Sequence, residues 1–160
     1  MPQLFTVMLI LRPYFRLLLF ILIVAGVSFS GAQFRPGDWY AGLMKPDWTP
    51  PNWIFPVVWS VLYLMIAVAG WLIFAASNRT LKILWLIQLA LNGLWSWIFF
   101  GMHLIGLGMI DILAIFFCTL ILLAFAYKFS RAVVWLMAPY LLWIGYASAL
   151  NVAIYFLNPA

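Results

Sequence analysis

The sequence predicts an all-α integral membrane protein, a bundle of five transmembrane helices. Of its 160 residues, 69% are hydrophobic and only 7% are charged, whereas about a quarter of the residues in soluble domains are charged. Five apolar runs recur along the chain, each near the ~20 residues that a helix needs to cross a bilayer. Because the runs are continuous rather than alternating, they fit helices and not the strands of a barrel. We expect a single domain, residues 1–160.

The expected spans are residues 15–33, 56–76, 81–100, 104–127 and 133–157. The first span has an alternative interpretation, because Arg12 and Arg16 precede a Leu- and Ile-rich core and the small residues Ser30, Gly31 and Ala32 follow it. That arrangement also fits a cleaved signal peptide. The intact mass of the purified protein distinguishes the two.

The net charge of +5 is spread over the breaks between the apolar runs. Arg35 and Lys45 fall on one side of the membrane, and the other basic residues fall on the side of the N-terminus: Arg12, Arg16, Arg79, Lys82, Lys128 and Arg131. This bias predicts that the N-terminus lies on the positively biased side, with the C-terminus opposite. We expect a bacterial cell membrane, with an outer membrane or the mitochondrial outer membrane as alternatives. Basic residues form no cluster of the kind that would bind nucleic acid, so no nucleic-acid partner is expected.

The longest connection, residues 34–55, leads into a stretch that is rich in Trp and Pro, Lys45 to Tyr63. The prolines between Pro46 and Pro51 predict a stiff, non-helical segment, and Pro56 suits the first turn of the next helix. Rigid aromatic rings at the mouth of a helix favour a lid over a pocket for a large flat ligand. The alternative is an aromatic belt at the membrane interface. Within the connection, we expect Asp38 to be the N-cap of a short helical turn.

Helical spacing places polar and aromatic residues on common faces of three spans. The faces comprise Phe55, Trp59 and Tyr63 in the second span, Gln88, Asn92, Trp95 and Phe99 in the third, and Tyr140, Trp143, Ala147, Asn151 and Ile154 in the fifth. Amides are costly in hydrocarbon unless they are paired, so these faces should point into the bundle. There the amides either bond neighbouring helices or, with the tryptophans, line a mixed aromatic and polar cavity.

The other chemically active groups are isolated in the sequence. Asp111 is the one acid within an apolar run, a candidate functional group, and we expect it to be a structural anchor near a helix N-terminus. His103 could bind a haem iron axially, but an interfacial position is expected. Cys118 is the single cysteine and has no intramolecular disulfide partner. No set of metal ligands, and no nucleophile with a base, is apparent, so neither a metal site nor a catalytic residue is expected.

Small residues lie on the opposite face of the fifth span. Gly145, Ala149 and Ala153 are spaced by four, a pattern that lets another helix approach closely. That helix belongs either to the same bundle or to a second subunit.

Three motifs resemble those of the translocator protein, or tryptophan-rich sensory protein (TspO/MBR), family. They are WYAGLMKPDWTPPNWIFPVVWSVLY from Trp39, QLALNGLWSWIFFGMH from Gln88 and PYLLWIGYASALN from Pro139. The resemblance implies a five-helix bundle, usually a homodimer, whose pocket binds porphyrins, haem and sterol-like or drug-like ligands under a lid formed by the first loop. By motif match, the residues that line or close the pocket would be Trp39, Trp48, Trp59, Asn92, Trp95, Trp143, Ala147 and Leu150.

Two departures from the family pattern stand out. Animal members end the fifth helix with a sterol pattern in which a basic residue follows a tyrosine. Here Leu150 and Tyr155 are present but no basic residue follows, which weakens a specific cholesterol role. Animal members also tend to have an aromatic residue at the position of Leu107.

Together these features predict a membrane receptor or translocator-type protein that binds protoporphyrin IX or haem in a Trp-lined cavity, with a role in tetrapyrrole transport or stress signalling. No cofactor is required. The ligand-binding residues are expected to be Trp39, Trp48, Phe55, Trp59, Tyr63, Gln88, Asn92, Trp95, Trp143, Ala147, Leu150 and Asn151. Arg35 and Lys45 are candidates to pair with the porphyrin carboxylates. The alternatives are an enzyme that degrades porphyrin oxidatively through Trp59 and Trp143, and a scaffold that binds sterols or lipids.

Overall fold

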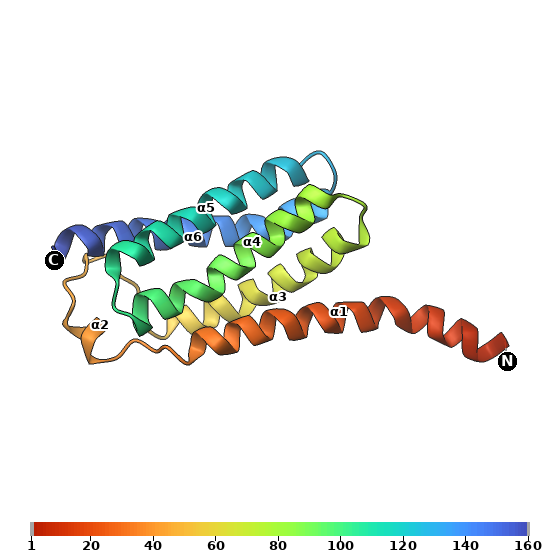
Figure 1. Cartoon of the computed structure of the whole chain (residues 1–160), viewed down its shortest axis with the longest axis horizontal. Coiled ribbons are helices and arrows are strands. Elements are labelled where there is room, and N and C mark those ends of the chain that lie inside the picture. The colour runs from red at the N-terminus through yellow and green to blue at the C-terminus, as the bar shows by residue number, and fades with distance from the viewer. Residues whose placement is uncertain (1, 160) are drawn as a thin grey trace.

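Five long helices make up most of the chain (Figure 1). The computed structural model describes the backbone of residues 2–159 and the side chains of residues 13–159. The helices are α1 (Pro2–Ala32), the short α2 (Asp38–Gly42), α3 (Ile54–Ala75), α4 (Arg79–Ser96), α5 (Ile105–Ala126) and α6 (Arg131–Leu157), and α4 continues into a π-helical turn, Trp97–Gly101. All but α2 are long and apolar enough to cross a membrane. The prediction of an all-α bundle with five transmembrane helices is therefore confirmed.

The long helices close into a ring that is not in sequence order. Contacts run from α1 to α3, then to α6, α5, α4 and back to α1, whereas α3 and α4 touch only sparingly although they are consecutive. The N-terminus and the α3–α4 and α5–α6 connections lie at one end of the bundle (Figure 1). The other end holds α2, the α4–α5 connection and the C-terminus. This ring of helices can enclose a space on its axis.

Local signals explain where the spans begin. Asn78 caps α4 by accepting a hydrogen bond from the Leu81 amide at 3.1 Å, so the helix starts two residues before the predicted span. Ser130 caps α6 in the same way through Val133. Pro56 is the third residue of α3, where its missing N–H costs no intrahelical bond. Helix α1 extends further towards the N-terminus than predicted, although its membrane-spanning part starts at Pro13. The side chain of Arg12 lies outside the described residues.

The prediction for Asp38 is wrong, because Gly37 occupies the N-cap position of α2 and no side chain caps this helix. The carbonyl oxygen of Gly37 already accepts the first helical bond, from the Ala41 amide at 3.0 Å. Asp38 is therefore the first helical residue rather than the cap.

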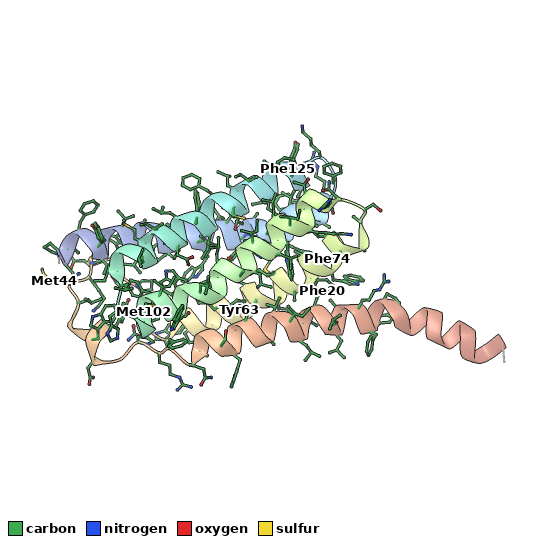
Figure 2. The ribbon with its side chains drawn as sticks, viewed as in Figure 1. Phe20, Met44, Tyr63, Phe74, Met102 and Phe125 are labelled. Carbon is green, nitrogen blue, oxygen red and sulfur yellow. The ribbon has the colours of Figure 1, made fainter. Side chains whose placement is uncertain are left out.

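The half of the bundle nearest the N-terminus is filled by side chains. Trp85 is fully buried there, and its indole Nε1 donates to the carbonyl oxygen of Ile66 at 3.1 Å. Gly70 makes room for the ring, because a Cβ at this position would lie 2.4 Å from a ring carbon of Trp85. Phe20 and Phe74 pack beside it, with ring centroids 5.1 Å apart (Figure 2). This packed half leaves the opposite half as the place for a cavity.

Candidate functional site

A cavity of about 660 Å³ occupies the half of the bundle nearest α2. All five long helices contribute to its wall, and the connection between α1 and α3 supplies its outer end through residues such as Arg35, Tyr40 and Asn52. Its size lies within the usual range for small-molecule sites, and its wall is mostly apolar with a few polar groups, as such sites are.

Most of the predicted ligand-binding residues line this cavity. They are Phe55, Trp59 and Tyr63 of α3, Asn92 and Trp95 of α4, and Trp143, Ala147, Leu150 and Asn151 of α6. The residue faces that helical spacing predicted on α3, α4 and α6 thus border the same cavity. That these residues bind a ligand stays a prediction.

The buried amide of Asn92 joins three helices. Tyr63 Oη donates to Asn92 Oδ1 at 2.8 Å, and Asn92 Nδ2 donates to Tyr140 Oη at 3.0 Å. The ring of Trp59 stacks on that of Tyr63, with centroids 5.1 Å apart. Both interpretations of this amide hold at once, since Asn92 bonds neighbouring helices and also lines the cavity.

Three of the predicted residues lie outside the cavity wall. Gln88 is fully buried, but its Nε2 donates to the carbonyl oxygen of Trp85, one turn back in its own helix. It shares a face with Asn92 but lies one turn deeper, where the packed half of the bundle begins. Trp39 and Trp48 instead pack the connection between α1 and α3 against other parts of the bundle, outside the cavity wall.

We call residues 34–55 the lid segment. The ring of Trp39 stacks on that of His103 in the α4–α5 connection, with centroids 4.2 Å apart and planes 17° apart. Trp48 packs edge-on against Tyr146, whose Oη donates to the Trp48 carbonyl oxygen at 2.7 Å. The predicted stiff part is non-helical between Leu43 and Trp53. The lid segment is thus tied to two other parts of the fold by aromatic contacts.

Similarity to known proteins agrees with this architecture. Residues 17–157 match the sequence model of the TspO/MBR family. The chain belongs to this family. It is 40% identical over 146 residues to the tryptophan-rich protein TspO of Chlorobaculum tepidum, covering 83% of this chain and 89% of that protein. It is 39% identical over 144 residues to the protein of the same name from Archaeoglobus fulgidus, covering 86% and 94%. It is 32% identical over 136 residues to the human translocator protein, covering 79% and 80%.

Family membership together with five apolar helices makes this chain a multi-pass membrane protein of the TspO/MBR family. The identification made from the Trp39, Gln88 and Pro139 motifs is confirmed. The names of the three relatives are those of translocator and tryptophan-rich proteins, and none of them is the name of an enzyme.

The lysine expected to pair with a ligand carboxylate has another role in this family member. Lys45 Nζ donates to the carbonyl oxygens of Tyr40 at 2.6 Å, Leu43 at 2.8 Å and Ala41 at 3.3 Å. These include the last carbonyls of α2, which a cation stabilises. Lys45 thus closes α2 and is not part of the cavity wall, and its pairing with a ligand carboxylate stays a prediction.

Several residues of the wall were not predicted. Ser28 and Gly31 of α1, and Ile112 and Ile115 of α5, line the cavity. Small and aliphatic residues also occur on the outward-facing sides of these two helices, so residues of these types do not mark the cavity face in the sequence. The π-helical turn was also missed, and it brings the adjacent Phe99 and Phe100 to the wall.

Tyr40 of α2 is a further unpredicted wall residue of this family member. Its side chain is buried and packs edge-on against the rings of Phe99 and Phe100. Burial raises the pKa of the Tyr40 hydroxyl above its ordinary value, and the nearby Tyr146 adds to the effect. Tyr40 therefore remains a neutral phenol and contributes an apolar ring to the outer end of the cavity.

Asp111 does not fit the role of an N-terminal anchor. Helix α5 begins at Ile105, so Asp111 is its seventh residue, beyond the first turn in which the helix dipole acts. Its side chain is only 8% exposed, and its Oδ2 has no hydrogen-bond partner within the described part of the chain. It does not line the cavity.

The small-residue face of α6 divides between two environments. A Cβ on Gly145 would lie 3.2 Å from a ring carbon of Phe116 in α5, so Gly145 allows close packing inside the bundle. Ala149, one turn further on, is exposed on the outer surface. The face thus packs within the bundle at Gly145 and is open to lipid or a second subunit at Ala149.

Proposed function

We propose that this TspO/MBR family member binds tetrapyrroles, protoporphyrin IX or haem, in the cavity and acts in their transport or in stress signalling. The observation that carries the proposal is the convergence of Trp59, Trp95 and Trp143 from three helices on one cavity of about 660 Å³. A porphyrin is a flat and largely apolar ring, and aromatic side chains bind such rings by stacking and edge contacts. The names of the relatives, translocator and tryptophan-rich proteins, are in keeping with it.

The polar atoms in the wall support a ligand that also offers hydrogen bonds. The indole Nε1 atoms of Trp95 and Trp143 and the Oδ1 of Asn151 are buried without a partner among the described residues. A buried polar group without a partner costs ~1–3 kcal/mol. Small shifts of these side chains towards a ligand with nitrogen or oxygen acceptors would recover part of that cost. No cofactor is needed for binding of this kind.

A titration with protoporphyrin IX tests the proposal. Purified protein in neutral detergent is titrated while tryptophan fluorescence and the porphyrin absorption spectrum are both recorded. Binding predicts saturable quenching of the tryptophans with the porphyrin chemically unchanged. Absence of saturable quenching contradicts the proposal and favours the alternative of a scaffold that binds sterols or lipids.

A second candidate function follows from the positions of Trp59 and Trp143, which line the same cavity. Both would lie beside a bound porphyrin, as an enzyme that degrades it through redox-active tryptophans requires. New absorption bands that form on illumination or with an added oxidant, and that disappear in Trp59→Phe and Trp143→Phe, would support this enzyme. Porphyrin that is recovered intact would support binding alone.

A further inference from the structure

The wall of the cavity is neutral except at one place. Among the described residues that line the cavity, Arg35 is the one that carries a charge. It lies three residues after the end of α1 and is exposed, so it lies at the mouth of the cavity. Its Nε donates to the carbonyl oxygen of Ala32 at 3.3 Å, which ties the side chain to the end of α1. This bond uses one of the five N–H donors of the guanidinium.

The nearest other charged residues in the sequence, Asp38 and Lys45, do not contribute a free charge to the cavity wall. The ammonium of Lys45 is occupied by three backbone carbonyls of the lid segment. Asp38 is exposed and is not part of the cavity wall. Arg35 is therefore the group that gives the mouth its positive charge.

The inner end of the cavity has the opposite character. Tyr63, Asn92 and Tyr140 form a neutral hydrogen-bonded chain there, and the rings of Trp59 and Tyr63 stack beside it. A carboxylate placed at this depth would lose its water without gaining a cation, which is unfavourable. The cavity is thus polarised along its length, with an exposed cation at the mouth and neutral aromatic groups inside.

We propose that the cavity selects amphipathic acids and orients them, with the acid group at Arg35 and the apolar body among the tryptophans. This inference rests on the proposed function, because it takes protoporphyrin IX as the ligand. Both propionates of this porphyrin leave from one edge of the ring, and the other edges carry only methyl and vinyl groups. The propionate edge would face Arg35, and the apolar edge would point towards Tyr63.

The test compares protoporphyrin IX with its dimethyl ester, which has the same ring but no charge. Wild-type protein, Arg35→Gln, Arg35→Lys and Arg79→Gln are titrated with each porphyrin in neutral detergent. Arg79 is the matched control, because it is an exposed arginine and the first residue of α4, which starts at the opposite end of the bundle (Figure 1). Affinity for the ester reports whether each variant keeps its fold and its cavity.

Wild-type protein should bind the diacid about five-fold more tightly than the ester, the upper end for an exposed ion pair. Arg35→Gln should remove this preference by weakening diacid binding alone, while Arg35→Lys and Arg79→Gln should retain most of it. High salt should reduce the preference, since it screens exposed charges.

Two results would overturn the inference and leave the proposed function intact. One is equal affinity of the wild-type protein for the two porphyrins. The other is an undiminished diacid preference in Arg35→Gln. Failure of the wild-type protein to bind either porphyrin contradicts the proposed function itself, and the inference with it.

Discussion

The side-chain amide of Asn158 pairs with the backbone of Met44 through two hydrogen bonds. The Met44 amide donates to Asn158 Oδ1 at 2.9 Å, and Asn158 Nδ2 donates to the Met44 carbonyl oxygen at 2.9 Å. Met44 (Figure 2) lies at the same end of the bundle as the C-terminus (Figure 1). The pair therefore connects the end of α6 to the lid segment, 114 residues away in the sequence.

Asn158→Ala should loosen the lid segment and speed ligand release. The two hydrogen bonds to Met44 together contribute ~1–3 kcal/mol, so the dissociation rate of protoporphyrin IX should rise by at least about five-fold. Stopped-flow displacement measures this rate. Tyr155→Phe is the control, because Tyr155 lies on the same helix but forms no side-chain hydrogen bond among the described contacts. An unchanged rate in Asn158→Ala would show that the pair does not restrain the lid segment.

The prolines of the lid segment should affect ligand binding by restricting the backbone of this segment rather than by contacting the ligand. Replacing Pro46, Pro50 and Pro51 with alanine frees the backbone, so ordering the segment on binding costs more and affinity falls. Hydrogen exchange of residues 43–53 and ligand release should both become faster. Unchanged release in the triple variant would mean that the lid segment does not gate the cavity.

Each tryptophan of the cavity wall should contribute to porphyrin affinity on its own. Trp59→Ala, Trp95→Ala and Trp143→Ala should each weaken porphyrin binding by at least ~1 kcal/mol, the usual excess for aromatic pairs. Trp135→Ala is the matched control, because this tryptophan is 75% exposed on the outer surface. Equal losses at all four positions, measured by porphyrin absorption rather than by tryptophan fluorescence, would contradict a shared site.

Substitutions at two nearby positions of α6 should affect ligand binding and helix packing separately. Ala147 lines the cavity, so Ala147→Leu should fill part of it and change which ligands fit, with little change in thermal stability. Gly145→Leu should lower stability, because even a Cβ there lies 3.2 Å from Phe116. Thermal unfolding and porphyrin titration of both variants measure the two effects. The reverse pattern would show that the faces of α6 are assigned incorrectly.

Ala149 tests the outer surface of the same helix. Because it is exposed, Ala149→Leu should leave both stability and affinity of a monomer nearly unchanged. If Ala149 packs against a second subunit, the larger side chain should instead weaken a homodimer. Sedimentation in detergent at several protein concentrations distinguishes these outcomes.

Helical spacing predicted much of the site and failed where the spacing carried no information. Asn92 and Trp95, or Trp143 and Ala147, are recognisable because a polar or small residue recurs beside an aromatic one at the helical period. Ser28 and Ile115 were missed because small and aliphatic residues also face outward from α1 and α5, so they do not mark the cavity face. Helical spacing also predicts which side of a helix a residue faces, but not where it lies along the bundle axis. Gln88 is on the predicted face of α4 but lies one turn too far from the mouth to line the cavity.

Other differences arise from contacts between distant segments. The three carbonyls around Lys45 come together only when α2 has formed, and no pattern in the sequence shows this. The pairing of Asn158 with Met44 depends on the ring order of the helices, which places the C-terminus beside the lid segment. The order of the ring is a property of packing, and five similar apolar runs do not encode it locally.

The central claim is that a flat ligand binds inside the bundle, and a crystal structure of the protein with protoporphyrin IX tests it most directly. We expect density for the ring within the cavity bounded by Trp59, Trp95 and Trp143. Density for the ring on the outer surface, for example beside Trp135, with the cavity free of porphyrin, would contradict the account.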